Sequence, residues 1–348
     1  MLKTLSSLSS RITLSLSTLC LCLGLSLVLT ASASAQTPVR FTLDWKFEGP
    51  IAPYLLAHAR GYFAEEGLNV TIDSGTGSAG AVNRVASGAY DVGFADINAM
   101  IEFNVGNPDQ ALKAVFMIYD HPPFAIFTKK ESGIQTPADL AGKTLGAPVF
   151  DSPRKTFSAF AAATGLDADA VNWTSMDPPL REPMLLRGQV DAISGFYFTS
   201  LLNLENLGIP ADDLTVFLYP DYGVNLYGNA IIVSPQLAAQ PEVVKGFLRA
   251  VVRGWAETLE DPAAAIAYVR QRDGLIDVDL ETRRLKLAIE TSVATEYAAA
   301  NGMGDVDDER LAKAIAEVVN AFGLSTTPAP EAVFDRSFLP DQETRSIF

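Results

Sequence analysis

Cysteine is almost absent from this chain of 348 residues. It occurs only as Cys20 and Cys22, so the residues that follow cannot form disulfides, thiolate metal sites or a cysteine nucleophile. Histidine is equally rare, because His58 and His121 are the only two and no third partner completes a metal site with them. We therefore expect no metal site.

Basic residues are also in the minority. The chain has 26 lysines and arginines against 41 aspartates and glutamates, which gives a formal net charge of −15 at pH 7. Nucleic-acid binding requires basic patches, so we expect no nucleic-acid partner. The acidic residues are spread along the chain, as is typical of solvated faces.

Long apolar runs are missing after the N-terminal segment. The one run present follows Lys3 and Arg11 and ends before Ala33-Ser34-Ala35, a small-x-small pattern typical of signal-peptide cleavage. We expect residues 1–35 to be a signal peptide that is cleaved near Ala35 and directs the protein to the periplasm. An uncleaved membrane anchor is the alternative. Residues 36–348 are long enough for two domains with well-buried cores.

Strands and helices are expected to alternate from Phe41 to Asp96. The first strand, Val39 to Leu43, stops at Asp44-Trp45-Lys46-Phe47-Glu48, and the second, Asn69 to Ile72, opens into a glycine-rich loop. The third strand ends at Asp96. Charged and aromatic side chains thus follow the carboxyl ends of strands, where open parallel sheets bind ligands.

A second stretch of the chain repeats this plan with a strand, a helix, a strand and a helix, expected at 143–148, 155–164, 171–174 and 182–187. Residues 87–94 and 187–196 share a glycine after a helix, an aspartate, a buried strand and a glycine-aromatic exit. Two lobes built to one plan imply a ligand cleft between them.

Two apolar strands are expected to cross between the lobes, at 123–128 and 229–233. We therefore assign residues 36–125 and 229–348 to the first lobe and residues 126–228 to the second. Four segments with helical apolar spacing complete the first lobe, at 243–259, 263–270, 282–291 and 310–322. The alternation predicts an α/β fold with a mainly parallel sheet flanked by helices in each lobe.

Gly75-x-Gly77-x-x-Gly80 has the spacing of a dinucleotide-binding fingerprint. It follows the second strand rather than the first, and exported proteins are not normally supplied with nicotinamide cofactors. We favour a loop whose backbone N–H groups face a polar or anionic part of a ligand, without a cofactor. An exported hydrolase or oxidoreductase remains the distant alternative, although no Gly-x-Ser-x-Gly motif is present.

Aromatic residues beside turns suit a planar ring, and nearby carboxylates can accept hydrogen bonds from ring N–H groups. Arg154 and Arg181 offer the alternative, because a guanidinium selects a carboxylate, sulfonate or phosphate. The candidate ligand-binding residues are Asp44, Trp45, Phe47, Gly75, Gly77, Ser78, Asp96, Asn98, Phe124, Phe150, Asp151, Arg154, Arg181, Glu182, Phe196, Tyr197 and Tyr222.

Several motifs resemble a known family. They are Asp44-Trp45, Ala57-His58-Ala59-Arg60-Gly61-Tyr62-Phe63-Ala64-Glu65-Glu66-Gly67-Leu68-Asn69-Val70, Ser87-Gly88 with Asp91-Val92-Gly93, and Asp139-Leu140-Ala141-Gly142-Lys143. With these motifs the chain resembles the periplasmic solute-binding proteins of ABC importers, in the alkanesulfonate and thiamine-pyrimidine (hydroxymethylpyrimidine) binding family. The resemblance covers essentially all of residues 36–348.

The resemblance implies a two-lobed type II periplasmic binding protein fold that closes on a small solute by hinge motion. It also implies delivery to a membrane permease, by a protein that we expect to be a monomer. The family has an enzyme branch that makes the thiamine pyrimidine with pyridoxal phosphate, iron and a cysteine-rich motif. Because this chain lacks that motif, we expect no enzyme activity and no cofactor.

Two ligand classes remain open at this point. We favour a small planar nitrogen heterocycle related to pyrimidines, with Trp45 stacking on it and Asp44 accepting its hydrogen bonds. The rival ligand is an alkanesulfonate, taurine or another organic anion, held by Arg154 or Arg181 and the loop from Gly75 to Ser78.

Overall fold

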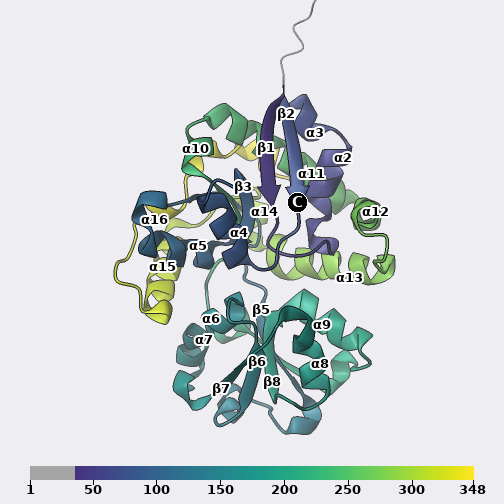
Figure 1. Ribbon diagram of the computed structural model, residues 1–348, viewed down its shortest axis with the longest axis vertical. Coiled ribbons are helices and arrows are strands. Elements are labelled where there is room, and N and C mark those ends of the chain that lie inside the picture. The colour runs from purple at the N-terminus through teal and green to yellow at the C-terminus, as the bar shows by residue number, and fades with distance from the viewer. Residues whose placement is uncertain (1–35) are drawn as a thin grey trace, which may run out of the picture. The chain divides into compact units, whose positions relative to one another are not determined.

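The computed structural model describes residues 36–348, so the expected signal peptide lies outside the described residues. Two five-stranded sheets form the framework, and Figure 1 shows helices on both faces of each. No helix within residues 36–348 is long and apolar enough to cross a membrane.

The first sheet has the strand order β2 (Leu68–Asp73), β1 (Thr37–Thr42), β3 (Val92–Asp96), β10 (Asn229–Val233), β4 (Lys113–Met117). The second sheet has the order β7 (Asn172–Ser175), β6 (Thr144–Ala147), β8 (Ala192–Phe196), β5 (Phe124–Lys129), β9 (Leu214–Leu218).

One strand in each sheet runs against its two neighbours. β10 is antiparallel to β3 and β4, and β5 is antiparallel to β8 and β9, whereas the remaining pairs are parallel. These are the strands by which the chain enters each sheet after leaving the other one, so they arrive from the opposite end. The predicted α/β fold with mainly parallel strand directions is confirmed, and each sheet is mixed because of its entering strand.

We call the first sheet with its helices the first lobe, and the second sheet with its helices the second lobe. The strands of the first lobe lie within 37–117 and 229–233, and those of the second within 124–218. Residues 118–123 and 219–228 connect them. β5 begins at Phe124, so the expected lobe boundary after residue 125 falls inside a strand of the second sheet.

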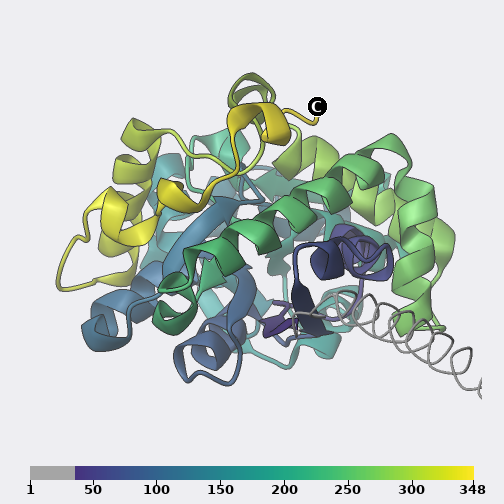
Figure 2. The same cartoon turned by 90° about the horizontal axis from the view of Figure 1, so that it is seen from above.

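The helices of the first lobe are α2 (Ala52–Ala59), α3 (Tyr62–Glu65), α4 (Ser78–Ala86), α5 (Ile97–Gly106), α10 (Pro235–Ala238), α11 (Pro241–Glu260), α12 (Pro262–Arg272), α13 (Val278–Ala288), α14 (Glu296–Asn301), α15 (Asp308–Phe322), α16 (Pro330–Val333) and α17 (Gln342–Arg345). Those of the second lobe are α6 (Ser152–Lys155), α7 (Phe157–Thr164), α8 (Arg181–Leu186) and α9 (Tyr197–Asn206). Figure 2 shows the long helix α11 running across the first lobe.

Aromatic packing fixes the end of β1. Phe41 is fully buried, and its ring meets Tyr54 of α2 at 5.3 Å and Phe247 of α11 at 5.2 Å, edge to face in both cases. Such pairs contribute about 0.5–1.5 kcal/mol each beyond the area that they bury. This packing therefore fixes the position at which the turn after β1 begins.

The glycine-rich loop supports the same turn. The N–H of Gly75 donates to the carbonyl of Trp45 at 2.9 Å, and the N–H of Gly77 donates to the carbonyl of Asp44 at 2.6 Å. A Cβ atom on Gly75 would lie 2.1 Å from the carbonyl oxygen of Leu43, so this position requires glycine. The loop thus holds the start of the turn at residues 44–48 in place through two backbone hydrogen bonds.

Candidate ligand-binding cavity

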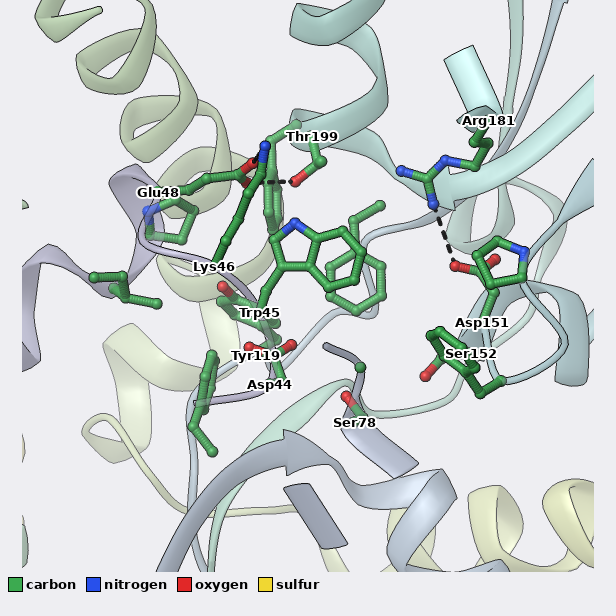
Figure 3. Close-up of a pocket in the computed structure, with 18 residues that line it drawn as sticks. Asp44, Trp45, Lys46, Glu48, Ser78, Tyr119, Asp151, Ser152, Arg181 and Thr199 are labelled. Atoms are coloured by element: carbon green, nitrogen blue, oxygen red, sulfur yellow. Dashed lines mark hydrogen bonds and ion pairs between the residues drawn. The ribbon is translucent and has the colours of Figure 1, made fainter. Parts of the chain in front are cut away.

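A cavity with about 670 Å³ of empty space, its open mouth included, is lined by residues of both lobes (Figure 3). Of the residues predicted from the sequence to bind ligand, those that line the cavity are Asp44, Trp45, Gly77, Ser78, Phe150, Asp151, Arg181 and Phe196.

Asp44 forms a buried acidic part of the wall and is only 7% exposed. Its Oδ2 accepts a hydrogen bond of 2.7 Å from Nδ2 of Asn229 in β10. Burial raises the pKa of Asp44 to about 7, against the opposing effect of the Asn229 bond. This carboxyl group therefore titrates near neutral pH.

Trp45 follows directly and is partly buried. In Figure 3 its indole projects between the Glu48–Thr199 pair and the Arg181–Asp151 pair. Its Nε1 is buried without a hydrogen-bond partner among residues 36–348. An unsatisfied buried donor costs about 1–3 kcal/mol, which a ligand acceptor would recover.

Glu48 joins the two lobes at the cavity wall. Its Oε1 lies 3.0 Å from Nζ of Lys46, and its Oε2 accepts a hydrogen bond of 3.2 Å from Oγ1 of Thr199 in α9. The Nε atom of Arg284 in α13 lies 3.7 Å from the same Oε2. Glu48 is 5% exposed and Arg284 is 1% exposed, so this pair is shielded from solvent.

Arg181 contributes a buried guanidinium from the second lobe. Its Nε and Nη2 donate to Oε1 of Glu182 at 3.0 and 2.8 Å, and its Nη1 donates to Oδ1 of Asp151 at 3.3 Å. Asp151 also accepts a hydrogen bond of 2.6 Å from Oγ of Ser194. Burial lowers the pKa of Arg181, but attraction to Glu182 and Asp151 outweighs this effect and the pKa is raised.

Phe150 closes one side of the cavity against Gly77. A Cβ atom on Gly77 would lie 2.7 Å from Cδ2 of Phe150, which is too close for any side chain to be accommodated without movement. Gly77 also has a φ angle of +138°, which L-residues rarely adopt. A ring from the second lobe thus packs on bare backbone of the first.

Four polar residues predicted to bind ligand lie outside the wall. Asp96 caps α5 by accepting the N–H of Asn98, whose amide in turn donates to the carbonyl of Tyr227. Burial raises the pKa of Asp96 to about 6. Arg154 donates to the carbonyl of Ala147 and lies 5.0 Å from the ring of Trp173, and Glu182 lies behind Arg181.

The other predicted residues outside the wall are aromatic, apart from Gly75, which holds the turn after β1 by a backbone hydrogen bond to Trp45. These aromatic rings pack against other side chains of the protein. Phe47 lies under the guanidinium of Arg272, Phe124 packs on Phe196, Tyr197 stacks on Phe127, and Tyr222 contacts Phe160 and Phe217.

Ten lining residues were not among the predicted ones: Lys46, Glu48, Pro50, Ile51, Phe94, Tyr119, Pro148, Ser152, Phe198 and Thr199. Lys46 and Glu48 belong to the turn after β1 that the sequence singled out, so the whole turn was the better signal. Phe198 and Thr199 follow the end of β8 in the first turn of α9, one step beyond the predicted pair Phe196 and Tyr197. Phe94 is the aromatic of the glycine-aromatic exit in residues 87–94, and Tyr119 is followed by Asp120 and Pro122, so turn residues beside both rings were the signal that could have found them.

Within residues 36–348, no group of three or more histidine, cysteine, aspartate or glutamate side chains is placed to hold a metal ion. The cavity instead offers hydrogen-bond acceptors, one unpaired indole N–H and flat aromatic faces.

Residues 49–265 match the protein-family model described as NMT1/THI5 like. The chain belongs to this NMT1/THI5-like family. The family resemblance predicted from the sequence motifs is confirmed.

Named relatives of this NMT1/THI5-like protein fall into two kinds. It is 27% identical over 300 residues to the riboflavin-binding protein RibY of Chloroflexus aurantiacus, covering 83% of this chain and 82% of the relative. It is 27% identical over 231 residues to the formylaminopyrimidine-binding protein of Halalkalibacterium halodurans, covering 66% and 68%. It is also 26% identical over 235 residues to an enzyme, the 4-amino-5-hydroxymethyl-2-methylpyrimidine phosphate synthase of Legionella pneumophila, covering 67% and 73%.

Solved structures show the same fold. The periplasmic aliphatic sulphonate binding protein SsuA from Escherichia coli superimposes with a TM-score of 0.67 at 15% identity, covering 88% of this NMT1/THI5-like chain and 93% of SsuA. The two-lobed periplasmic binding protein fold implied by the resemblance is therefore confirmed.

Proposed function

We propose that this protein is the solute-binding component of an ABC-type importer and that it works in the periplasm as a monomer. Its cavity captures a small planar nitrogen heterocycle related to pyrimidines, and the closed protein delivers this solute to a membrane permease. Two relatives support this class of ligand, because one is named for binding riboflavin and the other for binding a formylaminopyrimidine. Riboflavin itself contains a pyrimidine ring fused into its flavin.

One feature of the cavity carries the proposal. Asp44 and Trp45, adjacent on one turn, give the cavity wall a buried hydrogen-bond acceptor and an unpaired N–H donor. A pyrimidine edge offers the complement, since its ring and exocyclic groups provide N–H donors next to ring nitrogen or carbonyl acceptors. The indole face adds stacking, as do the rings of Phe150 and Phe196.

The rival anionic ligand is less well supported by the same geometry. It requires Arg154 or Arg181, but Arg154 does not line the cavity and Arg181 is bonded to two carboxylates. Catalysis is also less well supported than binding. No cysteine or histidine lines the cavity, and the chain has no cysteine after Cys22 with which to form the motif of the enzyme branch.

A melting-temperature screen tests the proposal. The exported protein, stripped of carried-over ligand, is heated with thiamine precursors, other pyrimidines, flavins, taurine, alkanesulfonates and nitrate. A true ligand at about a thousandfold over its Kd stabilises the folded protein by about 4 kcal/mol, which raises Tm by roughly ten degrees. Shifts with heterocycles support the proposal. A Tm shift with sulfonates alone would refute a heterocyclic ligand. The absence of a Tm shift with every compound of the panel would refute it as well.

A further inference from the structure

Arg181 is a buried cation on the cavity wall, and carboxylates of its own lobe already take part of its hydrogen-bonding capacity. Three of its nitrogen atoms donate to carboxylates, two of them to Glu182 and one to Asp151. Arg181 is 4% exposed as a residue, and its guanidinium lies against the backbone of β8, where a Cβ atom on Gly195 would be 3.0 Å from its Cζ. Arg181 is therefore held in place rather than poised for a ligand.

Glu182 is fixed as firmly as the arginine that it holds. It is 4% exposed and does not line the cavity. Its Oε1 accepts two hydrogen bonds from Arg181 and a third, of 2.9 Å, from Oγ of Ser200 in α9. The negative charge of Glu182 thus stays beside the guanidinium whether or not the cavity is filled.

The remaining charges of the wall do not favour an anion. The other lining cation, Lys46, has a side chain that is 63% exposed and is paired with Glu48. Asp44, Glu48 and Asp151 all present carboxyl groups to the cavity. The N-terminus of α4 offers a partial positive charge of about half a unit, which favours an anion but is too small to balance a full negative charge beside three carboxyl groups. A buried anion without a free cation is strongly disfavoured.

We propose that Glu182 determines the charge selectivity of the cavity: by holding Arg181, it restricts the ligand to molecules without a negative charge. The proposal rests on the ligand-binding role of the cavity and narrows its substrate class. Phosphorylated, sulfonated and carboxylated heterocycles are rejected, and the uncharged parent compounds are accepted. Glu182 acts through Arg181 and does not itself touch the ligand.

The variant Glu182→Gln tests this role, because it keeps the shape and an acceptor oxygen but removes the charge. Affinities are measured by calorimetry for riboflavin against riboflavin 5′-phosphate, for hydroxymethylpyrimidine against its phosphate, and for the sulfonate MOPS alone. Glu131→Gln is the matched control, since Glu131 is an exposed acid of the second lobe that is paired with Lys129 and does not line the cavity.

We expect the wild type to prefer the uncharged member of any pair that it binds and to show no binding of MOPS. Glu182→Gln should strengthen binding of the anionic member about tenfold to a hundredfold, the range expected for a freed charge-assisted hydrogen bond. The gain should weaken with added salt, and the uncharged member should change less than about threefold. Glu131→Gln should behave as the wild type.

Three results would overturn the proposal. The first is that the wild type binds an anionic member as tightly as its uncharged parent. The second is that Glu182→Gln keeps the wild-type preference for the uncharged member. The third is that Glu131→Gln changes this preference as much as Glu182→Gln does. If Glu182→Gln fails to fold, Asp151→Asn removes the charge at Nη1 and should shift the preference in the same direction. If no heterocycle binds the wild type, the proposed function fails, and the MOPS measurement on the variants still decides the role of Glu182.

Discussion

Replacing Asp44 by asparagine should stabilise the ligand-free protein at alkaline pH but not at acidic pH. The pKa of Asp44 is raised from 3.8 to about 7, chiefly by burial. The folded protein therefore holds this proton more tightly than the unfolded chain does, and ionisation of Asp44 opposes folding. The wild type should lose stability as the pH rises from about 4 to above 7, through both pKa values.

The size of this loss follows from the two pKa values. Their difference corresponds to about 4 kcal/mol, and relaxation around the charge makes about 2–4 kcal/mol a realistic range. The amide oxygen introduced by Asp44→Asn can still accept the hydrogen bond from Asn229, so the substitution removes the charge with little change in packing. The advantage of the variant over the wild type should be near zero at pH 4 and reach about 2–4 kcal/mol at pH 8.

Urea unfolding followed by circular dichroism at pH 4, 6 and 8 measures this difference. Asp96, with a pKa raised to about 6, contributes to both proteins and largely cancels in the comparison. Asp139→Asn is the control of opposite sign, because backbone hydrogen bonds lower the pKa of this exposed residue and its contribution is lost as the pH falls. A stability difference between Asp44→Asn and the wild type that stays constant from pH 4 to pH 8 would refute the reasoning.

Three further variants test the cavity wall and the contact between the lobes. Trp45→Ala should weaken heterocycle binding by one to two powers of ten in calorimetry, and unchanged affinity would remove Trp45 from the site. Gly77→Ala should lower the free energy of unfolding measured in urea, and adding Phe150→Ala should restore part of this loss by removing the clashing ring. No recovery in the double variant would assign the loss to the φ angle of Gly77. Arg284→Met should cost about 3–5 kcal/mol in urea unfolding, because it leaves the carboxylate of Glu281 buried and unpaired, and a cost below about 1 kcal/mol would contradict this.

Regular segments of the fold were predictable from local pattern, whereas strand direction was not. The expected helix at 243–259 appears as α11, and the expected strand at 69–72 appears within β2. The helix expected at 155–164 is split at Thr156 into α6 and α7. β5 and β10 are buried apolar runs like their parallel neighbours, and their antiparallel direction depends on how the chain passes between the sheets.

The candidate site shows the same limit at the level of single residues. The turn after β1 was recognisable because charge and aromatic rings follow a strand directly, and its residues Asp44 and Trp45 do line the cavity. Arg181 and Glu182 carry equally strong signals, but only Arg181 lines the cavity. Contacts with other helices decide which charged side chain lines the cavity and which one neutralises that side chain. The hydrogen bond from Ser200 of α9 to Glu182 is such a contact, and no local sequence pattern encodes it.

Contacts between the lobes flank the cavity on two sides. On one side Arg284 of the first lobe donates to the carbonyls of Phe198 and Thr199, which belong to the second lobe and line the cavity. On the other side the ring of Phe150 from the second lobe packs against Gly77 of the first.

Separating the lobes must break both sets of contacts and expose Arg284, which is 1% exposed here. A ligand between them touches both lobes at once, so it binds the closed arrangement better than an open one and shifts the population toward it. In the proposed importer, closure would then report occupancy to the permease. The buried bonds between the lobes stabilise the closed arrangement even without a ligand. The ligand therefore has to supply only the rest of the free-energy difference between the open and closed arrangements.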